Sequence, residues 1–143
     1  MSAQAAQSAP LSGRAYPTSE AYEKGTLDIG DFDHEAHVFV AWKLLEEDAF
    51  STATLRFTSA LKRLTRALGA EGKYHETISW FYMSLIAERR SRQPSPGWSA
   101  FAEANPELLS APAVLLENHY SKERLWSGLA KQQFLLPDRH PNG

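Results

Sequence analysis

Residues 74–92, YHETISWFYMSLIAERRSR, form the stretch that decides the fold. Tyr74, Ile78, Phe81 and Leu85 recur at helical spacing, and further apolar side chains cover much of the remaining circumference. A helix that is apolar nearly all round is buried on most of its sides. We therefore predict a central helix here, with the rest of the chain packed around it.

Two earlier segments also have the pattern of helices. Asp33 suits a helix N-terminus, so we predict a helix over His34–Glu47. The next segment carries an apolar stripe at helical spacing. Its members are Phe57, Leu61, Leu64 and Leu68. Ser51 or Thr52 is expected to cap the start of this second helix, and Gly69 to end it.

The chain beyond the central helix has the pattern of short helices. Pro106 and Pro112 divide residues 98–120 into pieces, and Ser121 is expected to cap a last helix over residues 122–134. No segment shows the period-two alternation of a strand. We predict an all-α fold, a compact single-domain helical bundle of four to six helices.

The composition of the two ends predicts the domain limits. The first residues are rich in Ala, Ser, Gln and Pro, which bury little, so we expect a flexible N-terminal arm over residues 1–26. The helical domain is predicted over residues 27–138, and a loose C-terminal tail over residues 139–143.

The overall composition excludes several function classes. The chain has 143 residues, 43% of them apolar, and no Cys, which excludes thiolate catalysis, disulfides and iron–sulfur clusters. The formal net charge of -2 makes a nucleic-acid partner unfavourable. The sequence also shows neither a membrane-spanning run nor a secretory signal, so we expect no membrane partner and a cytoplasmic location.

Two histidine segments carry the candidate chemistry. His34 and His37 are three positions apart and share one face of the first helix, while His75 is followed by Glu76 at the start of the central helix. Short links predict that these two helices run in the same direction, with their N-termini at one end of the bundle. We therefore expect the three imidazoles, Tyr74 and Glu76 at one level of the fold.

Three chemistries fit this cluster, and the sequence leaves all three open. The first is a metal site for zinc, iron or manganese with His34, His37, His75 and Glu76 as ligands. The second is metal-free acid–base catalysis by His75 and Glu76 with Tyr74 beside them. The third is anion binding at the two helix N-termini. In the ordinary structural alternative, these residues are only first-turn polar groups and a core histidine.

Aromatic residues favour a small-molecule ligand. They can line a pocket, in which Tyr74 and Tyr82 would supply hydroxyl groups. The other candidates are Trp42, Trp80, Phe81, Trp98, Phe101 and Trp126. His119 is a further candidate for the site, from a later loop, whereas His140 is expected in solvent.

The segments FDHEAH and KYHETISW, with NPELL and LAKQQFLLPD after them, resemble a group of short uncharacterised bacterial proteins over about residues 30–138. Those proteins share an F-x-H-x-x-H and a Y-H-E-T segment. The residues here that match are Phe32, His34, His37, Tyr74, His75, Glu76 and Thr77. The resemblance implies that the two histidine segments form one unit, and it implies no activity.

The leading hypothesis from the sequence is a small enzyme that acts on a small organic molecule through the His/Glu cluster, with or without a metal. The alternative is a non-catalytic helical module that binds a ligand or a protein. Its binding surface would be a groove near Trp98 or the basic face of the second helix, which carries Arg63 and Arg66.

Overall fold

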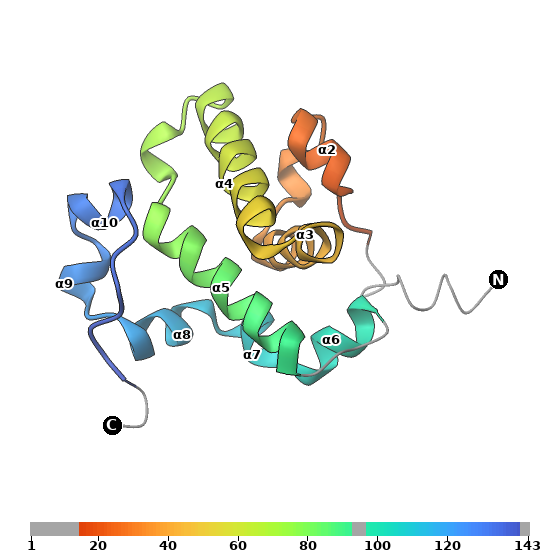
Figure 1. The fold of residues 1–143 in the computed structure, drawn as a ribbon. Helices are drawn as coiled ribbons and strands as arrows, with labels where there is room; N and C mark the ends of the chain where they lie inside the picture. The colour runs from red at the N-terminus through yellow and green to blue at the C-terminus, as the bar shows by residue number, and fades with distance from the viewer. Residues whose placement is uncertain (1–14, 93–96, 141–143) are drawn as a thin grey trace.

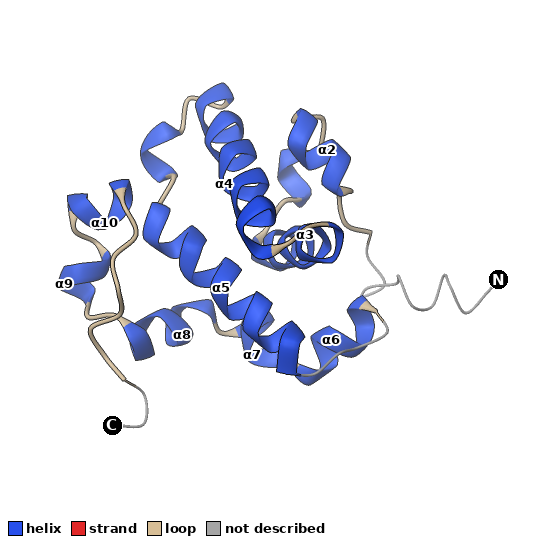
Figure 2. Cartoon of the chain, in the orientation of Figure 1, coloured by secondary structure: helices blue, strands red, loops and turns tan. Residues whose placement is uncertain are grey.

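The computed structural model describes residues 15–92 and 97–140. These ranges contain nine α-helices and two 3-10 helices (Figure 1) and no strand (Figure 2). The α-helices are α2 Ser19–Lys24, α3 His34–Glu47, α4 Phe50–Ala67, α5 Glu76–Arg92, α6 Trp98–Ala104, α7 Pro106–Ser110, α8 Pro112–His119, α9 Lys122–Leu125 and α10 Gly128–Gln132. The 3-10 helices are η1 Ile29–Asp31 and η2 Glu71–Lys73. The all-α class is confirmed, but four to six helices were too few.

Helix α3 has the predicted bounds because its N-terminus is capped as expected. The side chain of Asp33 accepts a hydrogen bond from the backbone N–H of Ala36 at 3.0 Å. Helix α4 differs at its start. Its N-cap is Ala49, which gives no side-chain hydrogen bond, so neither Ser51 nor Thr52 caps it. At its end Gly69 has a φ of 69°, the left-handed conformation expected after a helix.

The helices α3, α4 and α5 pack on one another and form the centre of the molecule. In Figure 1 α3 is seen nearly along its axis, whereas α5 (green) runs across the view. The two helices therefore cross, and the expectation that they run in the same direction is wrong. Helix α3 also packs against α7, an element that a simple up-and-down bundle lacks.

Part of the predicted N-terminal arm is packed. Residues 1–14 lie outside the described ranges, but residues 19–24 form α2, which packs against α4. Tyr22 is 1% exposed and its hydroxyl donates to the carbonyl of Phe57. Arg56 of α4 pairs with Glu23 of α2 and with Asp48 at 2.7 Å. One buried aromatic ring and one ion-pair network thus hold a segment whose composition predicted little burial.

The C-terminal part is divided more finely than predicted. The expected last helix is two helices, because the Ser127 side chain accepts a hydrogen bond from the N–H of Ala130 and so begins α10. In the predicted tail, the Arg139 N–H donates to the carbonyl of His119 at 3.0 Å, and residues 141–143 lie outside the described ranges. In the described ranges no helix is long and apolar enough to span a bilayer.

An aromatic cluster fills the core between α3 and α6. Trp98 is the first residue of α6 and is 1% exposed, with its ring centroid 5.2 Å from Phe39 and 5.7 Å from Trp42. Phe101 completes the cluster. Trp98 is therefore a core residue, and a binding groove that presents its ring is excluded. Most of the preceding loop, residues 93–96, lies outside the described ranges.

Candidate functional site

A cavity of about 450 Å³ lies between the three central helices and η2. Its wall is mostly apolar, and this volume falls in the range of pockets that hold small organic ligands. Its apolar lining includes Val38, Ala41, Leu61, Met83 and Ile86, with the rings of Phe32, Phe57, Tyr74 and Tyr82. Its polar lining includes Asp33, His34, His37, Thr65, Lys73, His75 and Ser79.

Four of the five predicted site residues line this cavity. They are His34 and His37 from the start of α3, and Tyr74 and His75 from the residues just before α5. Glu76 does not line it. The two histidine segments therefore meet at one cavity, although the helices that carry them cross.

His75 is fully engaged by the backbone. Its Nε2 lies 2.7 Å from the carbonyl oxygen of Leu125, so this nitrogen carries the proton. Its Nδ1 accepts the N–H of Ile78 at 3.2 Å, which makes His75 the N-cap of α5. Burial lowers the pKa of His75 below its usual value, since the ring is only 6% exposed. The ring is thus neutral and has no free nitrogen, which argues against His75 as an acid, a base or a metal ligand.

His34 is anchored to a different part of the molecule. Its Nε2 donates to the carbonyl of Leu108 in α7 at 2.7 Å. Its ring meets the edge of Tyr82, with 5.3 Å between centroids. Tyr82 lies seven residues after His75 on the same helix, about 10 Å along the axis at 1.5 Å per residue. The imidazoles of His34 and His75 therefore do not converge on one point.

His37 is held by its own helix and keeps one nitrogen free. Its Nδ1 donates to the carbonyl of Asp33 at 2.7 Å, and its ring stacks on Phe32 with 3.9 Å between centroids. Burial lowers the pKa of His37, and the hydrogen bond to Asp33 opposes that effect only in part. The neutral ring then has its lone pair on Nε2, for which the described residues offer no hydrogen-bond partner.

Glu76 belongs to a separate group of side chains on the outer side of α5. Its carboxylate accepts from the Tyr74 hydroxyl at 2.5 Å and from the indole N–H of Trp80 at 3.1 Å. Lys62 of α4 lies 3.7 Å from the same carboxylate. These contacts use both carboxylate oxygens, so Glu76 is held as a structural acid beside the cavity instead of inside it.

The donor groups do not form a metal site. The three histidines donate to three different carbonyls, those of Leu108, Asp33 and Leu125. Within the ranges that the structure describes, no three His, Asp or Glu side chains are grouped closely enough to hold a metal ion. The predicted site for zinc, iron or manganese therefore has no support from the geometry.

Three further side chains were predicted from the sequence, those of Tyr82, His119 and His140. Tyr82 lines the cavity, but its hydroxyl donates to the carbonyl of Pro112 at 2.9 Å, and burial raises its pKa. His119 lies elsewhere, with Nδ1 2.8 Å from the carbonyl of Leu115 and its ring against Phe81. His140 is exposed. None of these three side chains adds a free polar group to the cavity.

Sequence reasoning missed three polar residues of the cavity. Thr65 and Lys73 come from the end of α4 and from η2, and Ser79 comes from the first turns of α5. The position of Ser79 carried a signal, because it is a small polar residue in an otherwise apolar helix and lies one turn after His75. Lys73 could have been suspected from its place directly before Tyr74.

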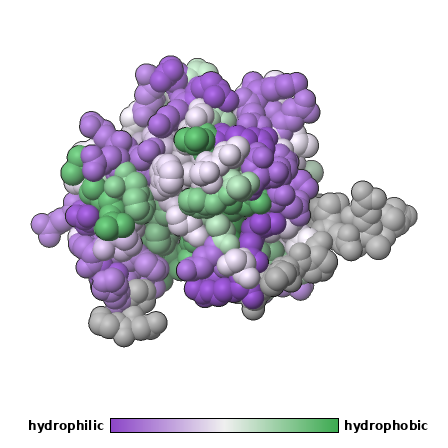
Figure 3. All heavy atoms as spheres, viewed as in Figure 1, coloured by the Kyte–Doolittle hydropathy of each residue, from purple (hydrophilic) through white to green (hydrophobic). Residues whose placement is uncertain are grey.

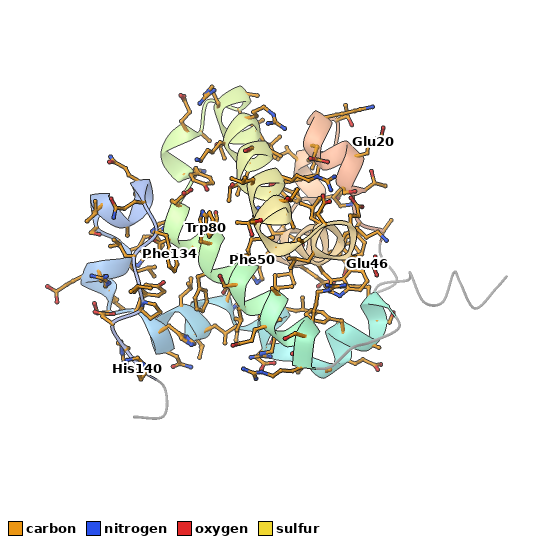
Figure 4. All side chains as sticks on the ribbon, in the orientation of Figure 1. Glu20, Glu46, Phe50, Trp80, Phe134 and His140 are labelled. Carbon is orange, nitrogen blue, oxygen red and sulfur yellow. The ribbon has the colours of Figure 1, made fainter. Side chains whose placement is uncertain are left out.

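A second feature, outside the cavity, is a row of aromatic side chains at the surface. Phe50, Trp80 and Phe134 come from α4, α5 and the C-terminal segment, and Figure 4 shows them close together. Trp80 lies 6.3 Å from each of the other two rings, measured between centroids. Figure 3 shows hydrophobic side chains at the surface on this face, on the left and near the centre.

Comparisons of the chain with models of protein families, with curated proteins and with solved structures gave no match. The function is therefore argued below from the cavity and its side chains.

Proposed function

We propose that the protein binds a small, largely apolar organic molecule in the cavity between α3, α4 and α5. The observation that carries this proposal is the cavity itself, about 450 Å³ in volume with a mostly apolar wall. Such a wall favours ligands with apolar surface, since burial of that surface contributes about 25 cal/mol per Å². The free Nε2 of His37 gives the ligand one polar contact whose direction is fixed by the bond to Asp33.

The test is to fill the cavity and to measure the binding of a neutral bicyclic probe, naphthalene carboxamide. Ala41 lines the cavity and is 1% exposed, so Ala41→Leu places a larger side chain in the space. Ala67 is the exposed last residue of α4, and Ala67→Leu is the matched control. We expect saturation-transfer NMR to show binding to the natural protein and to Ala67→Leu, and at least a roughly tenfold loss in Ala41→Leu. Equal binding to all three proteins would contradict the proposal.

A second candidate function is proton abstraction from the bound molecule, with His37 as general base. It is favoured by one observation: the proton on Nδ1 is held by the Asp33 carbonyl, which leaves Nε2 as the basic atom. The lowered pKa of His37 keeps this ring neutral near neutral pH. An enzyme of this kind needs no metal, which agrees with the donor geometry described above.

Ring opening of nitrobenzisoxazole tests the base directly. A base removes the ring C–H proton, the N–O bond breaks, and a nitrile and a phenolate form, so no other reactant is needed. The natural protein and the exposed-tail control His140→Gln should open the ring at the same rate, and His37→Gln should lose about a hundredfold. If all three proteins react equally but naphthalene carboxamide still binds, the cavity is a non-catalytic binding site.

A further inference from the structure

Lys73 is the one side chain of the described cavity lining that carries a permanent positive charge. It is the last residue of η2 and is exposed, so it stands where the cavity meets solvent. Within residues 15–92 and 97–140 its ammonium group has no carboxylate within ion-pair distance. By contrast, Lys62, eleven residues earlier, lies 3.7 Å from Glu76. A charge with no partner at the edge of a cavity is available to a ligand.

The acidic residue of the described cavity lining, Asp33, does not lie within ion-pair distance of Lys73. Asp33 accepts the N–H of Ala36 with one carboxylate oxygen and so caps α3. Its negative charge therefore faces the positive end of the α3 dipole. Lys73 is thus the charged residue of the described lining whose charge faces neither an ion-pair partner nor a helix dipole.

The rest of the lining restricts the body of the ligand. Phe32, Phe57, Tyr74 and Tyr82 contribute four aromatic rings to the wall. Flat aromatic groups pack well against such rings by edge or offset stacking. A carboxylate at the cavity edge would keep part of its hydration while the apolar body is buried.

We propose that the ligand of this cavity is a small aromatic carboxylic acid whose carboxylate pairs with the ammonium group of Lys73. This inference rests on the proposed ligand-binding function and adds the chemical class of the ligand. His37 lines the same cavity, and a carboxylate bound there favours its protonated imidazole. Binding of the anion is then coupled to uptake of a proton at acidic pH.

The experiment compares two probes of equal shape, naphthalene carboxylate and naphthalene carboxamide, by isothermal titration calorimetry at low salt. We expect the carboxylate to bind the natural protein about fivefold more tightly than the amide, as for one exposed ion pair. At neutral pH, where the His37 ring is neutral, this preference should vanish in Lys73→Gln. The matched control is Lys122→Gln, an exposed lysine of α9 outside the cavity, which should keep the preference.

The outcomes separate the two proposals. If the amide binds as tightly as the carboxylate, and Ala41→Leu abolishes both, the cavity binds ligands but the inference about the carboxylate is overturned. If the preference survives in Lys73→Gln, the assignment of the anion to Lys73 is overturned. If neither probe binds, the proposed function fails together with this inference. An increase of the His37 pKa on addition of the carboxylate, observed by NMR, is the expected second readout.

Discussion

At the start of α5 both ring nitrogens of His75 bind backbone groups, whereas at the start of α3 only one ring nitrogen of His37 does so. Both residues lie in or beside the first turn of a long helix and both line the same cavity. Burial lowers the pKa of each ring. The difference lies in the partners: Leu125 of α9 supplies a carbonyl to His75, and the N–H of Ile78 takes its remaining lone pair.

This comparison shows that the hydrogen bonds of a histidine decide its role more than its place in a cavity does. An imidazole with two backbone partners fixes the fold, because either partner would be left unsatisfied without it. An imidazole with one partner has its tautomer set and its other nitrogen free. His75 is accordingly a structural residue, whereas His37 and, by the same criterion, His34 each keep one ring nitrogen for contact with a ligand.

The largest expected effect is the loss of stability in His75→Ala. This variant removes the N-cap of α5 and leaves the buried carbonyl of Leu125 without its donor. We expect the free energy of unfolding to fall by about 2–4 kcal/mol, measured by urea denaturation. His37→Ala loses only one hydrogen bond and a ring contact, so it should cost about 1 kcal/mol.

His75→Asn sharpens this prediction. The Asn side chain can accept the N–H of Ile78 as an N-cap, but it is too short to replace the bond to Leu125. The fall in the free energy of unfolding should be smaller for His75→Asn than for His75→Ala, but greater than zero. A cost for His75→Ala no larger than that for His37→Ala would contradict the assigned difference between the two residues.

The next effect is the dependence of stability on pH. The folded pKa values of His75 and His37 lie below the ordinary value, so the unfolded chain binds more protons as the pH falls below about 6.5. Each histidine then lowers the free energy of unfolding by at most about 1.4 kcal/mol per pH unit, until the folded pKa is reached.

Urea denaturation of the natural protein and of His75→Asn, between neutral and weakly acidic pH, measures the contribution of His75. The plot of unfolding free energy against pH should be flatter for the variant over this window, because it lacks one of the two rings whose pKa is lowered in the folded protein. Parallel curves would show that the folded and unfolded pKa values of His75 are equal, contrary to its burial.

The smallest effect concerns Glu76, the acidic residue beside His75. Tyr74→Phe removes one donor to its carboxylate but leaves Trp80 and Lys62 in place. We expect a loss of about 0.5–1.5 kcal/mol in thermal unfolding, with binding of naphthalene carboxamide unchanged. A large loss of binding with unchanged stability would place the Tyr74 hydroxyl in the binding site.

Local signals in the sequence predicted much of the fold. The cap at Asp33 and the turn at Gly69 predicted the start of α3 and the end of α4, and the apolar circumference of residues 74–92 predicted a central helix. These features depend on neighbouring residues only. The crossing of α3 and α5 and the packing of α7 against α3 are contacts between distant segments, which no local pattern shows.

The sequence predicted the location of the candidate site but not the roles of its side chains. The two histidine segments do line one cavity, because both precede or begin helices that pack together. The roles of the rings could not be predicted, since the carbonyl partners Leu108 and Leu125 lie far along the chain from His34 and His75. The orientation of Glu76 likewise depends on Trp80 and Lys62, whose positions around it require the folded structure.

Long-range ¹H–¹⁵N NMR spectra of the imidazoles, recorded with and without naphthalene carboxylate, test the central difference between His37 and His75. Without the probe, we expect His37 with its proton on Nδ1 and His75 with its proton on Nε2. On addition of the probe, the Nε2 resonance of His37 should shift while both nitrogens of His75 stay in place. A shift of the His75 nitrogens with His37 unaffected would reverse the roles assigned to the two residues.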